Sequence, residues 1–248
     1  MRRLGAVLLA SAVSLLSAAP DAAARGFKVY GVEAPARGET EAVYWADYVV
    51  AGGKDSADRL WRHTVEIDYS FSDRWTLGVF GDFEDTKEGS LRYAQARFLL
   101  RTKVLDVSPS GAGLAFHVVY DFPENWYRSY EQVEVRMIFE QFFGIWNVRL
   151  NPIFEKKTSG PNVTDGLSFA YAAGAYRPVS PSVSAGIELH GGIGEIRDRD
   201  PTPKQKHYVV PTFKWRVNKR LSWEVGAAVG YTRDADDFTL KSLLEYRF

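Results

Sequence analysis

Cysteine is absent from the 248 residues of the sequence, and histidine occurs only four times. Without cysteine no disulfide can form, so backbone pairing and packing alone must hold the fold. The same scarcity, with no H-x-H or H-x3-H spacing, predicts neither a metal nor a cofactor. After the N-terminal region no segment has the roughly 20 apolar residues of a membrane helix. If the chain enters a membrane, it must do so as a closed barrel.

Neither sign of charge is in excess, because 31 lysines and arginines balance 31 aspartates and glutamates. A chain without a basic surplus has no general attraction for nucleic acid, so we expect no nucleic-acid partner. No Pro/Ser-rich linker or low-complexity tract divides the chain, which favours one domain. Tyrosine, tryptophan and phenylalanine make up 14% of the residues, a content more typical of strands than of helices.

The first 24 residues have the three parts of a secretory signal peptide. They comprise a basic start, Met1-Arg2-Arg3, then an apolar run over residues 4–16, then an A-x-A cleavage site, Ala22-Ala23-Ala24. The apolar run is too short to span a bilayer. We therefore expect a signal peptide over 1–24, a periplasmic N-terminal segment over 25–36, and one barrel domain over 37–248.

Apolar and polar residues alternate with a period of two over twelve segments, the pattern of half-buried strands. The segments are 38–51, 60–71, 75–85, 90–103, 113–122, 130–142, 145–156, 166–177, 182–195, 206–217, 221–233 and 237–248. Connections after the second, sixth, eighth and tenth are short, the one after the fourth is somewhat longer, and the rest are polar and mostly longer. An even strand number, with short turns at one end and long loops outside the cell, is typical of bacterial outer-membrane barrels.

Each segment has one face that is almost free of charge, and parity alone does not say whether that face meets a soluble core or lipid. The few polar residues on this face each follow a long loop, which places them at the outer rim of a barrel: His63, Arg92, Glu131 and His207. A soluble exported sandwich or jelly roll, the alternative fold, offers no reason for that clustering.

Aromatic residues on the apolar face gather beside the short turns, as in the girdle of a membrane barrel at the lipid interface. The predicted girdle residues are Trp75, Trp146, Trp215, Trp223 and Phe248. We therefore predict an all-β, antiparallel, up-and-down transmembrane β-barrel of twelve strands. Its place would be the outer membrane of a Gram-negative bacterium, among outer-membrane lipid and lipopolysaccharide.

Two stretches resemble known proteins. The ending TLKSLLEYRF, with its terminal Phe248, resembles the C-terminal signature that the bacterial barrel-assembly machinery recognises, which implies that machinery as a folding partner. The stretches Gly38-Glu39-Thr40-Glu41, Val65-Glu66-Ile67-Asp68-Tyr69 and Asp73-Arg74-Trp75 resemble a family of uncharacterised proteobacterial outer-membrane proteins. That resemblance covers roughly the first third of the mature chain. It implies a porin-like or transporter-like outer-membrane β-barrel and no particular substrate or catalytic residue.

Inward-facing side chains decide whether such a barrel conducts. By parity, a basic wall of the lumen contains Arg97, Arg101, Arg136, Arg149, Lys214 and Arg216. An acidic wall, from the first three segments, contains Glu41, Asp47, Glu66, Asp68 and Asp82. Interior charges must be hydrated or paired, so the walls indicate either a wet lumen for charged solutes or ion pairs that fill a narrow barrel. A one-residue register error or a bulge would reverse the assignments on a strand.

These features favour a passive channel for small polar or charged solutes, with such a solute as its partner. A structural or adhesive outer-membrane protein with an occluded lumen is the alternative, and an outer-membrane hydrolase is the third. His117 with Asp121, and His190 with Glu188, share a face, but no serine signature accompanies them. We therefore expect these histidines to form hydrogen bonds in the lumen, and we predict no enzyme and no catalytic residue.

Overall fold

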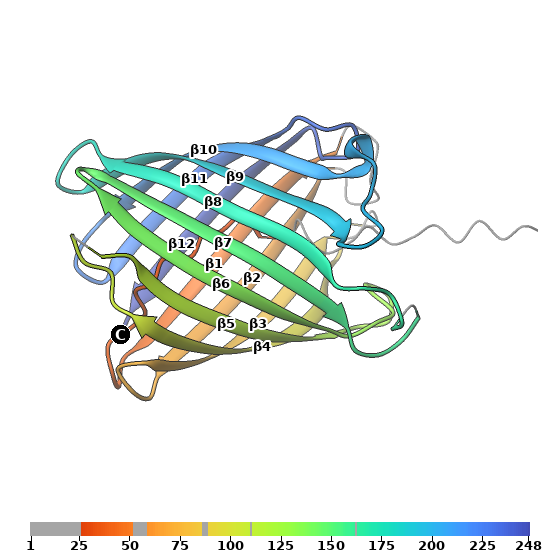
Figure 1. Cartoon of the computed structure of the whole chain (residues 1–248), viewed down its shortest axis with the longest axis horizontal. Helices are drawn as coiled ribbons and strands as arrows, with labels where there is room; N and C mark the ends of the chain where they lie inside the picture. The colour runs from red at the N-terminus through yellow and green to blue at the C-terminus, as the bar shows by residue number, and fades with distance from the viewer. Residues whose placement is uncertain (1–25, 52–58, 86–88, 110, 162) are drawn as a thin grey trace, which may run out of the picture.

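The computed structural model describes residues 26–51, 59–85, 89–109, 111–161 and 163–248. In these residues the chain forms antiparallel strands that each pair with their neighbours in sequence, and β1 pairs with β12 to close a barrel (Figure 1). The strands are β1 (Thr40–Val50), β2 (Leu60–Ser70), β3 (Trp75–Asp85), β4 (Leu91–Leu105), β5 (Gly113–Pro123), β6 (Gln132–Phe143), β7 (Trp146–Lys157), β8 (Ser168–Pro178), β9 (Val183–Glu195), β10 (Lys206–Arg216), β11 (Leu221–Gly230) and β12 (Phe238–Arg247). The prediction of a twelve-stranded, up-and-down, all-β barrel is confirmed.

The apolar face of the strands is the outside of the barrel. On β3, Leu77 and Val79 are about half exposed, whereas Thr76 and Asp82, on the opposite parity, are buried. Large apolar side chains are exposed in the same way on the other strands. An apolar exterior around a charged interior is the pattern of a barrel that spans a membrane. No helix in the described residues is long and apolar enough to cross a membrane.

The two ends of the barrel differ as predicted. Turns at residues 71–74, 144–145, 179–182 and 217–220 gather at the left end in Figure 1, together with the C-terminus. The longer connections lie at the opposite end; their described residues are 124–131, 158–161 with 163–167, 196–205 and 231–237. The tightest turn places Gly144 at a φ of +61°, a conformation that glycine adopts without strain. We call these the short-turn end and the long-loop end.

A β-bulge reverses the facing of residues 91–93 at the start of β4. Arg92, predicted on the apolar face, therefore lies opposite Glu84 of the lumen face. The pairing of β3 with β4 shifts between Asp82 and Phe83, so that Asp82 lies opposite Gln95 and Phe83 opposite Tyr93. Parity from Gln95 predicts that Tyr93 faces the lumen, but its ring packs against Phe83 on the outside of the barrel. The extra residue, Ala94, is fully buried. Bulges reorient side chains in this way because two residues on one strand oppose one on its partner.

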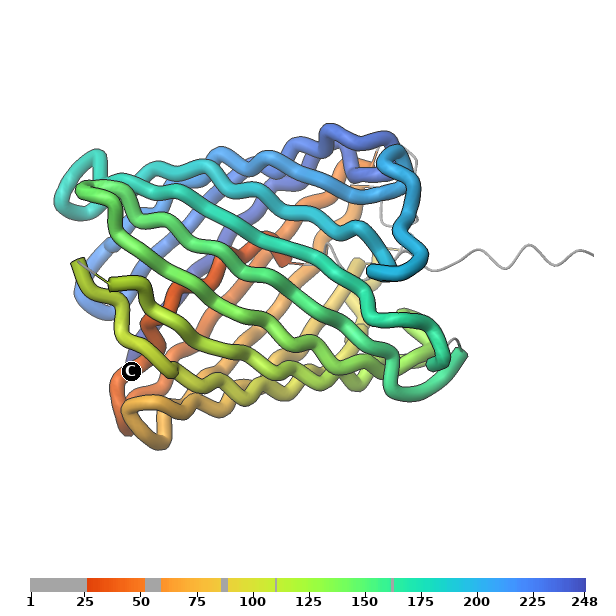
Figure 2. The backbone as a smooth tube through the Cα atoms, viewed as in Figure 1, coloured from red at the N-terminus to blue at the C-terminus, as the bar shows by residue number. Residues whose placement is uncertain are grey.

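Residues 26–33 lie inside the barrel, where we had expected a segment in the periplasm. Figure 2 shows this stretch, in red, running from the short-turn end into the middle of the lumen. Phe27, Val29, Tyr30 and Val32 are all buried there, at 7% exposure or less. Removing this apolar surface from water favours the inserted position. Residues 1–25, which contain the predicted signal peptide and cleavage site, lie outside the described residues.

Candidate functional site in the barrel lumen

The lumen wall holds the N-terminal segment by its backbone. The Asn151 side chain on β7 makes two hydrogen bonds with Tyr30: Oδ1 accepts from the backbone N–H at 2.8 Å and Nδ2 donates to the carbonyl at 3.1 Å. The Glu140 carboxylate on β6 accepts from the backbone N–H of Val32 at 2.6 Å. A buried amide that is unpaired carries a large penalty, so these contacts are what allows the peptide to sit in the lumen.

Two buried cations bind carbonyl groups of the same segment. The Arg101 Nη2 atom on β4 lies 2.6–2.8 Å from the carbonyl oxygens of Gly31, Val32 and Glu33. The Lys241 ammonium on β12 donates to the carbonyl oxygen of Phe27 at 2.8 Å. The segment is thus held near both of its ends by charge-assisted hydrogen bonds, which are stronger than neutral ones.

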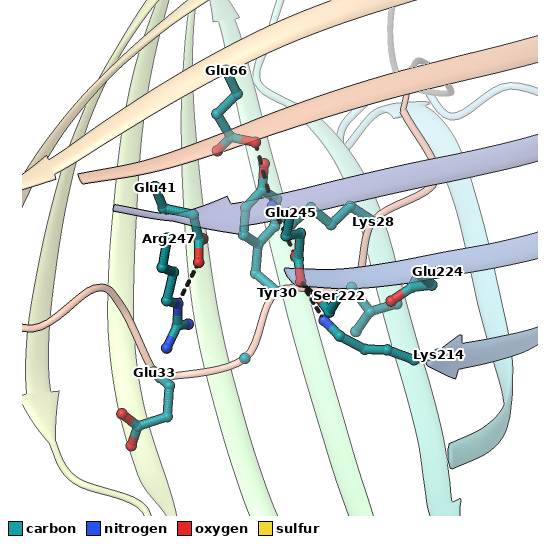
Figure 3. A network of polar contacts seen from close by, with 12 residues as sticks. Lys28, Tyr30, Glu33, Glu41, Glu66, Lys214, Ser222, Glu224, Glu245 and Arg247 are labelled. Carbon is teal, nitrogen blue, oxygen red and sulfur yellow. Dashed lines mark hydrogen bonds and ion pairs between the residues drawn. The ribbon is translucent and has the colours of Figure 1, made fainter. Parts of the chain in front are cut away.

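Lys28 extends these contacts through its side chain. Its Nζ atom lies 3.3 Å from Glu66 on β2 and 3.8 Å from Glu245 on β12, and Figure 3 shows it between the two carboxylates. The ammonium also lies over the rings of Tyr30 and Trp45. Burial by itself lowers the pKa of Lys28, but the nearby carboxylates, Glu66 foremost, outweigh it and hold that pKa above its usual value. The lysine therefore remains charged at neutral pH.

The predicted basic residues of the mid-lumen do not form a wall of their own. Arg97 pairs with Asp82 at 2.8 Å. Arg136 pairs with Glu134 at 3.0 Å, and Arg149 with Glu140 at 3.2 Å. Acidic and basic residues are therefore interleaved around the lumen. Mutual pairing lowers the cost of holding these charges away from bulk water.

The predicted acidic residues also lie in the lumen, and all five are buried: Glu41, Asp47, Glu66, Asp68 and Asp82. Glu41 accepts from Arg247 Nε at 2.6 Å at the short-turn end, and Glu66 faces Lys28. Asp82, nearer the long-loop end, binds Thr64 and Gln95 besides Arg97. Glu41, Glu66 and Asp82 therefore belong to separate networks at different depths of the barrel.

Lys214 and Arg216 are the last two predicted basic residues. They line a cavity of about 250 Å³ at the short-turn end. Smaller cavities, of about 50 and 30 Å³, lie beyond the tip of the N-terminal segment and are lined by Gly26 and, in the smaller one, Phe27. The large cavity at the short-turn end has no lining residue from that segment. The segment thus lies between the cavities of the two ends and narrows the lumen at its middle.

The five predicted girdle residues face outward. Trp75, Trp146, Trp215 and Trp223 are 40–46% exposed beside the short turns, and Phe248 is 64% exposed at the C-terminus. Trp215 and Trp223 are opposite one another on β10 and β11. Trp223 Nε1 also donates to Ser242 Oγ at 2.9 Å. Indole rings that combine apolar contact with a polar N–H suit the level of lipid headgroups.

Solved outer-membrane channels share this fold. The COG4313 outer membrane channel from Pseudomonas putida F1 has a TM-score of 0.61 at 14% identity, with 87% of this chain and 97% of that chain covered. The KdgM porin has a TM-score of 0.58 at 10% identity, with 84% of this chain and 99% of that chain covered. KdgM in complex with disordered oligogalacturonate has a TM-score of 0.57 at 8% identity, with 85% and 99% covered.

No protein-family model and no curated protein sequence matches the chain. The resemblance of its opening to uncharacterised proteobacterial outer-membrane proteins therefore stays a prediction. At these low identities the structural likeness concerns the barrel itself. Contacts with lipid, lipopolysaccharide and the barrel-assembly machinery also remain predictions.

The histidines have partners other than serine in the described part of the chain. His190 Nε2 lies 2.9 Å from Glu188, whose carboxylate also binds Lys241. His117 packs edge-on against the ring of Tyr30. His63 and His207, at the outer rim, bind the tyrosine hydroxyls of Tyr44 and Tyr171. None of these contacts provides an activated serine nucleophile.

The sequence does not indicate that several lumen residues bind the N-terminal segment. Alternation along β4 and β7 puts Arg101 and Asn151 on the lumen face, but nothing in their own strands indicates a peptide partner. The available signal was the composition of residues 26–33, GFKVYGVE, which is too apolar for a solvated leader. Polar wall residues opposite an apolar stretch of backbone are consistent with a peptide held in the lumen.

Proposed function

We propose that this chain is a passive outer-membrane channel for small charged solutes, with its lumen narrowed by residues 26–33. The observation that carries the proposal is the arrangement of the lumen, in which charged side chains line cavities at both ends of the inserted segment. The likeness of the barrel to solved outer-membrane channels supports it. Charged walls in a confined lumen favour ions over neutral solutes.

The inserted segment restricts the size of the solutes. Side chains of β4, β6, β7 and β12 hold it, so it is a fixed obstruction in the middle of the lumen. A barrel of twelve strands without it would have a wider passage. We therefore expect a low single-channel conductance and passage of small solutes only.

A sealed barrel is the second candidate, because the same contacts favour a stable obstruction. The rings of Phe27 and Tyr30 pack edge-on against His190 of β9 and His117 of β5. In that case the chain would act as a structural or adhesive surface protein through its long loops. Neither candidate includes a catalytic step.

Single-channel recording of the refolded mature protein tests the proposal. We expect steady low-conductance openings in a planar bilayer and a reversal potential in a salt gradient that shows ion selectivity. Arg97→Gln, in the lumen, should shift that reversal potential. Arg233→Gln, which removes the same charge from an exposed loop where the side chain is 67% exposed, should leave it unchanged.

A folded barrel that never conducts would contradict the channel proposal. Heat-modifiable migration in electrophoresis provides the check on folding, because a closed barrel resists unfolding by detergent at room temperature. Silent bilayers with protein that passes this check would favour the sealed barrel. The search for function would then move to the long-loop end.

A further inference from the structure

The cavity at the short-turn end has an excess of positive charge. Its lining includes five cations, Lys214, Arg216, Lys219, Arg220 and Arg247, and two carboxylates, Glu41 and Glu245. Cavities with one sign of charge and low-dielectric walls concentrate the field and raise the local concentration of counter-ions. This cavity therefore attracts anions from the solution at that end of the barrel.

Both carboxylates of the cavity already have cationic partners. Glu245 Oε2 accepts from Lys214 at 2.5 Å and from Ser222 at 2.7 Å, as Figure 3 shows. Glu41 accepts from Arg247 Nε at 2.6 Å. The acidic side chains are thus neutralised within the cavity and leave the other cations available.

Arg216, Lys219 and Arg220 make no ion pair within the described residues, although each lines the cavity. Arg216 ends β10 on the lumen side, opposite Ser222 of β11. The other two lie in the tight turn that follows, residues 217–220, so the three approach one space from adjacent positions. Guanidinium groups favour carboxylate and phosphate groups because they donate two parallel hydrogen bonds.

Hydroxyl groups complete a surface suited to oxygen-rich anions. Ser182 and Ser184 line the cavity beside two of its cations: the backbone N–H of Arg216 donates to the Ser182 carbonyl, and Ser184 pairs with Lys214 across β9 and β10. Serine hydroxyls donate hydrogen bonds to oxyanions without adding charge. The cavity has a volume of about 250 Å³. That is the space of about eight water molecules in the liquid, which admits one small molecule and excludes a folded polymer.

We propose that this cavity is a binding site for a small multivalent oxyanion, a polycarboxylate or a phosphate ester, at the inner mouth of the channel. The inference rests on the proposed function and names the class of solute that it would carry. No residue of the N-terminal segment lines the cavity, so the site is accessible from the short-turn end with the segment in place. In an outer-membrane barrel that end faces the periplasm.

Calorimetric titration of the refolded mature protein with citrate, in a nonionic detergent at low salt, tests the site. We expect saturable binding that weakens at least tenfold in the double variant Arg216→Gln/Arg220→Gln. The matched control is Arg197→Gln/Arg233→Gln, which removes the same charge from connections at the long-loop end and should change the affinity less than twofold. Absence of citrate binding, or equal loss in both double variants, would overturn the proposal.

A lipid phosphate presents the same chemistry as a solute, so the titration is repeated in nanodiscs. If the site takes a free solute, the difference between the wild type and Arg216→Gln/Arg220→Gln persists in both phosphatidylcholine and phosphatidylglycerol. If that difference disappears only with phosphatidylglycerol, a lipid headgroup occupies the site and the solute assignment is wrong.

The anion-binding site and the channel proposal can be rejected independently of each other. Citrate binding by a protein that never conducts would retain the site and reject the channel. Steady conductance without citrate binding would retain the channel and reject the site. Because calorimetry does not depend on an open pore, the two results test separate statements.

Discussion

Asn151 and Tyr30 are joined by a pair of hydrogen bonds in which one side-chain amide satisfies both backbone groups of a residue 121 positions away. The arrangement imitates the exchange between two paired residues of an antiparallel sheet. It fixes the N-terminal segment at mid-lumen without adding a thirteenth strand. The contact therefore decides how much of the lumen stays open.

Asn151→Leu should loosen the segment and increase conductance. The substitution keeps the size of the side chain but leaves the N–H and C=O of Tyr30 without partners, at a cost of about 1–3 kcal/mol. Each 1.4 kcal/mol changes a population about tenfold, so the released state becomes much more frequent. Single-channel recording should show added openings of higher conductance. Gln132→Ala, another buried polar residue of the lumen, is the control and should conduct like the wild type.

Lys241→Met should destabilise the barrel strongly. The ammonium is fully buried between Glu188 at 2.7 Å and Glu224 at 2.8 Å, and it also binds Phe27. Removing it leaves Glu224 and Glu188 without this cation, although Glu188 keeps its contacts with His190 and Tyr176, and breaking a buried ion pair costs about 3–5 kcal/mol. Urea unfolding in detergent should show a lower midpoint, and adding Glu188→Gln should recover part of the loss. An unchanged midpoint would contradict the idea that this cation neutralises the lumen.

Lys219→Met is the matched control for Lys241→Met. It removes the same charge from an exposed turn at the short-turn end. Surface substitutions of this kind change stability by about 0.5 kcal/mol or less. A loss as large as that of Lys241→Met would indicate that total charge, and not burial, determines the stability of the barrel.

The strands and the two ends of the barrel could be predicted because they depend on local pattern. Alternation over about ten residues sets the facing of each strand, and it held wherever no bulge intervened. Tyr93 departs from it because β4 contains one extra residue, Ala94, which reverses the facing of the residues that precede it on the strand. Nothing in the sequence indicates this bulge. The outward tryptophans followed from the same local pattern.

The contents of the lumen could not be predicted in the same way. Phe27 and Val29 differ in parity from Tyr30 and Val32, so residues 26–33 lack the strand pattern. Their partners lie far along the chain, as with Val32 and Glu140, 108 positions apart. The pairing of opposite charges likewise depends on diagonal contacts such as Arg97 with Asp82. Such contacts are set by how the strands are staggered in the closed barrel.

The ion pairs of Lys28 should be insensitive to pH over the neutral and mildly alkaline range. Its pKa is raised in the folded protein because nearby carboxylates, Glu66 foremost, outweigh the effect of burial. Stability from a raised pKa is fully present below the unfolded value of about 10.4 and is lost only as the pH rises through the folded value. The difference in unfolding free energy between wild type and Lys28→Met should therefore be constant from about pH 7 to 10. A difference that shrinks near pH 8 would show that the lysine is not held by those carboxylates.

Lipid-based quenching should separate the tryptophans of the girdle from the one in the lumen. Trp75 is 40% exposed on the outside of the barrel, whereas Trp45 is 4% exposed and faces Lys28 in the lumen. Brominated acyl chains quench indoles only at short range, so they reach the outer rings and not the inner one. Trp75→Phe should reduce the quenchable part of the fluorescence in brominated vesicles, and Trp45→Phe should reduce only the part that resists quenching. If Trp45→Phe removed quenchable emission instead, β1 would have to face the opposite way, with Asp47 toward lipid, where an unpaired carboxylate is costly.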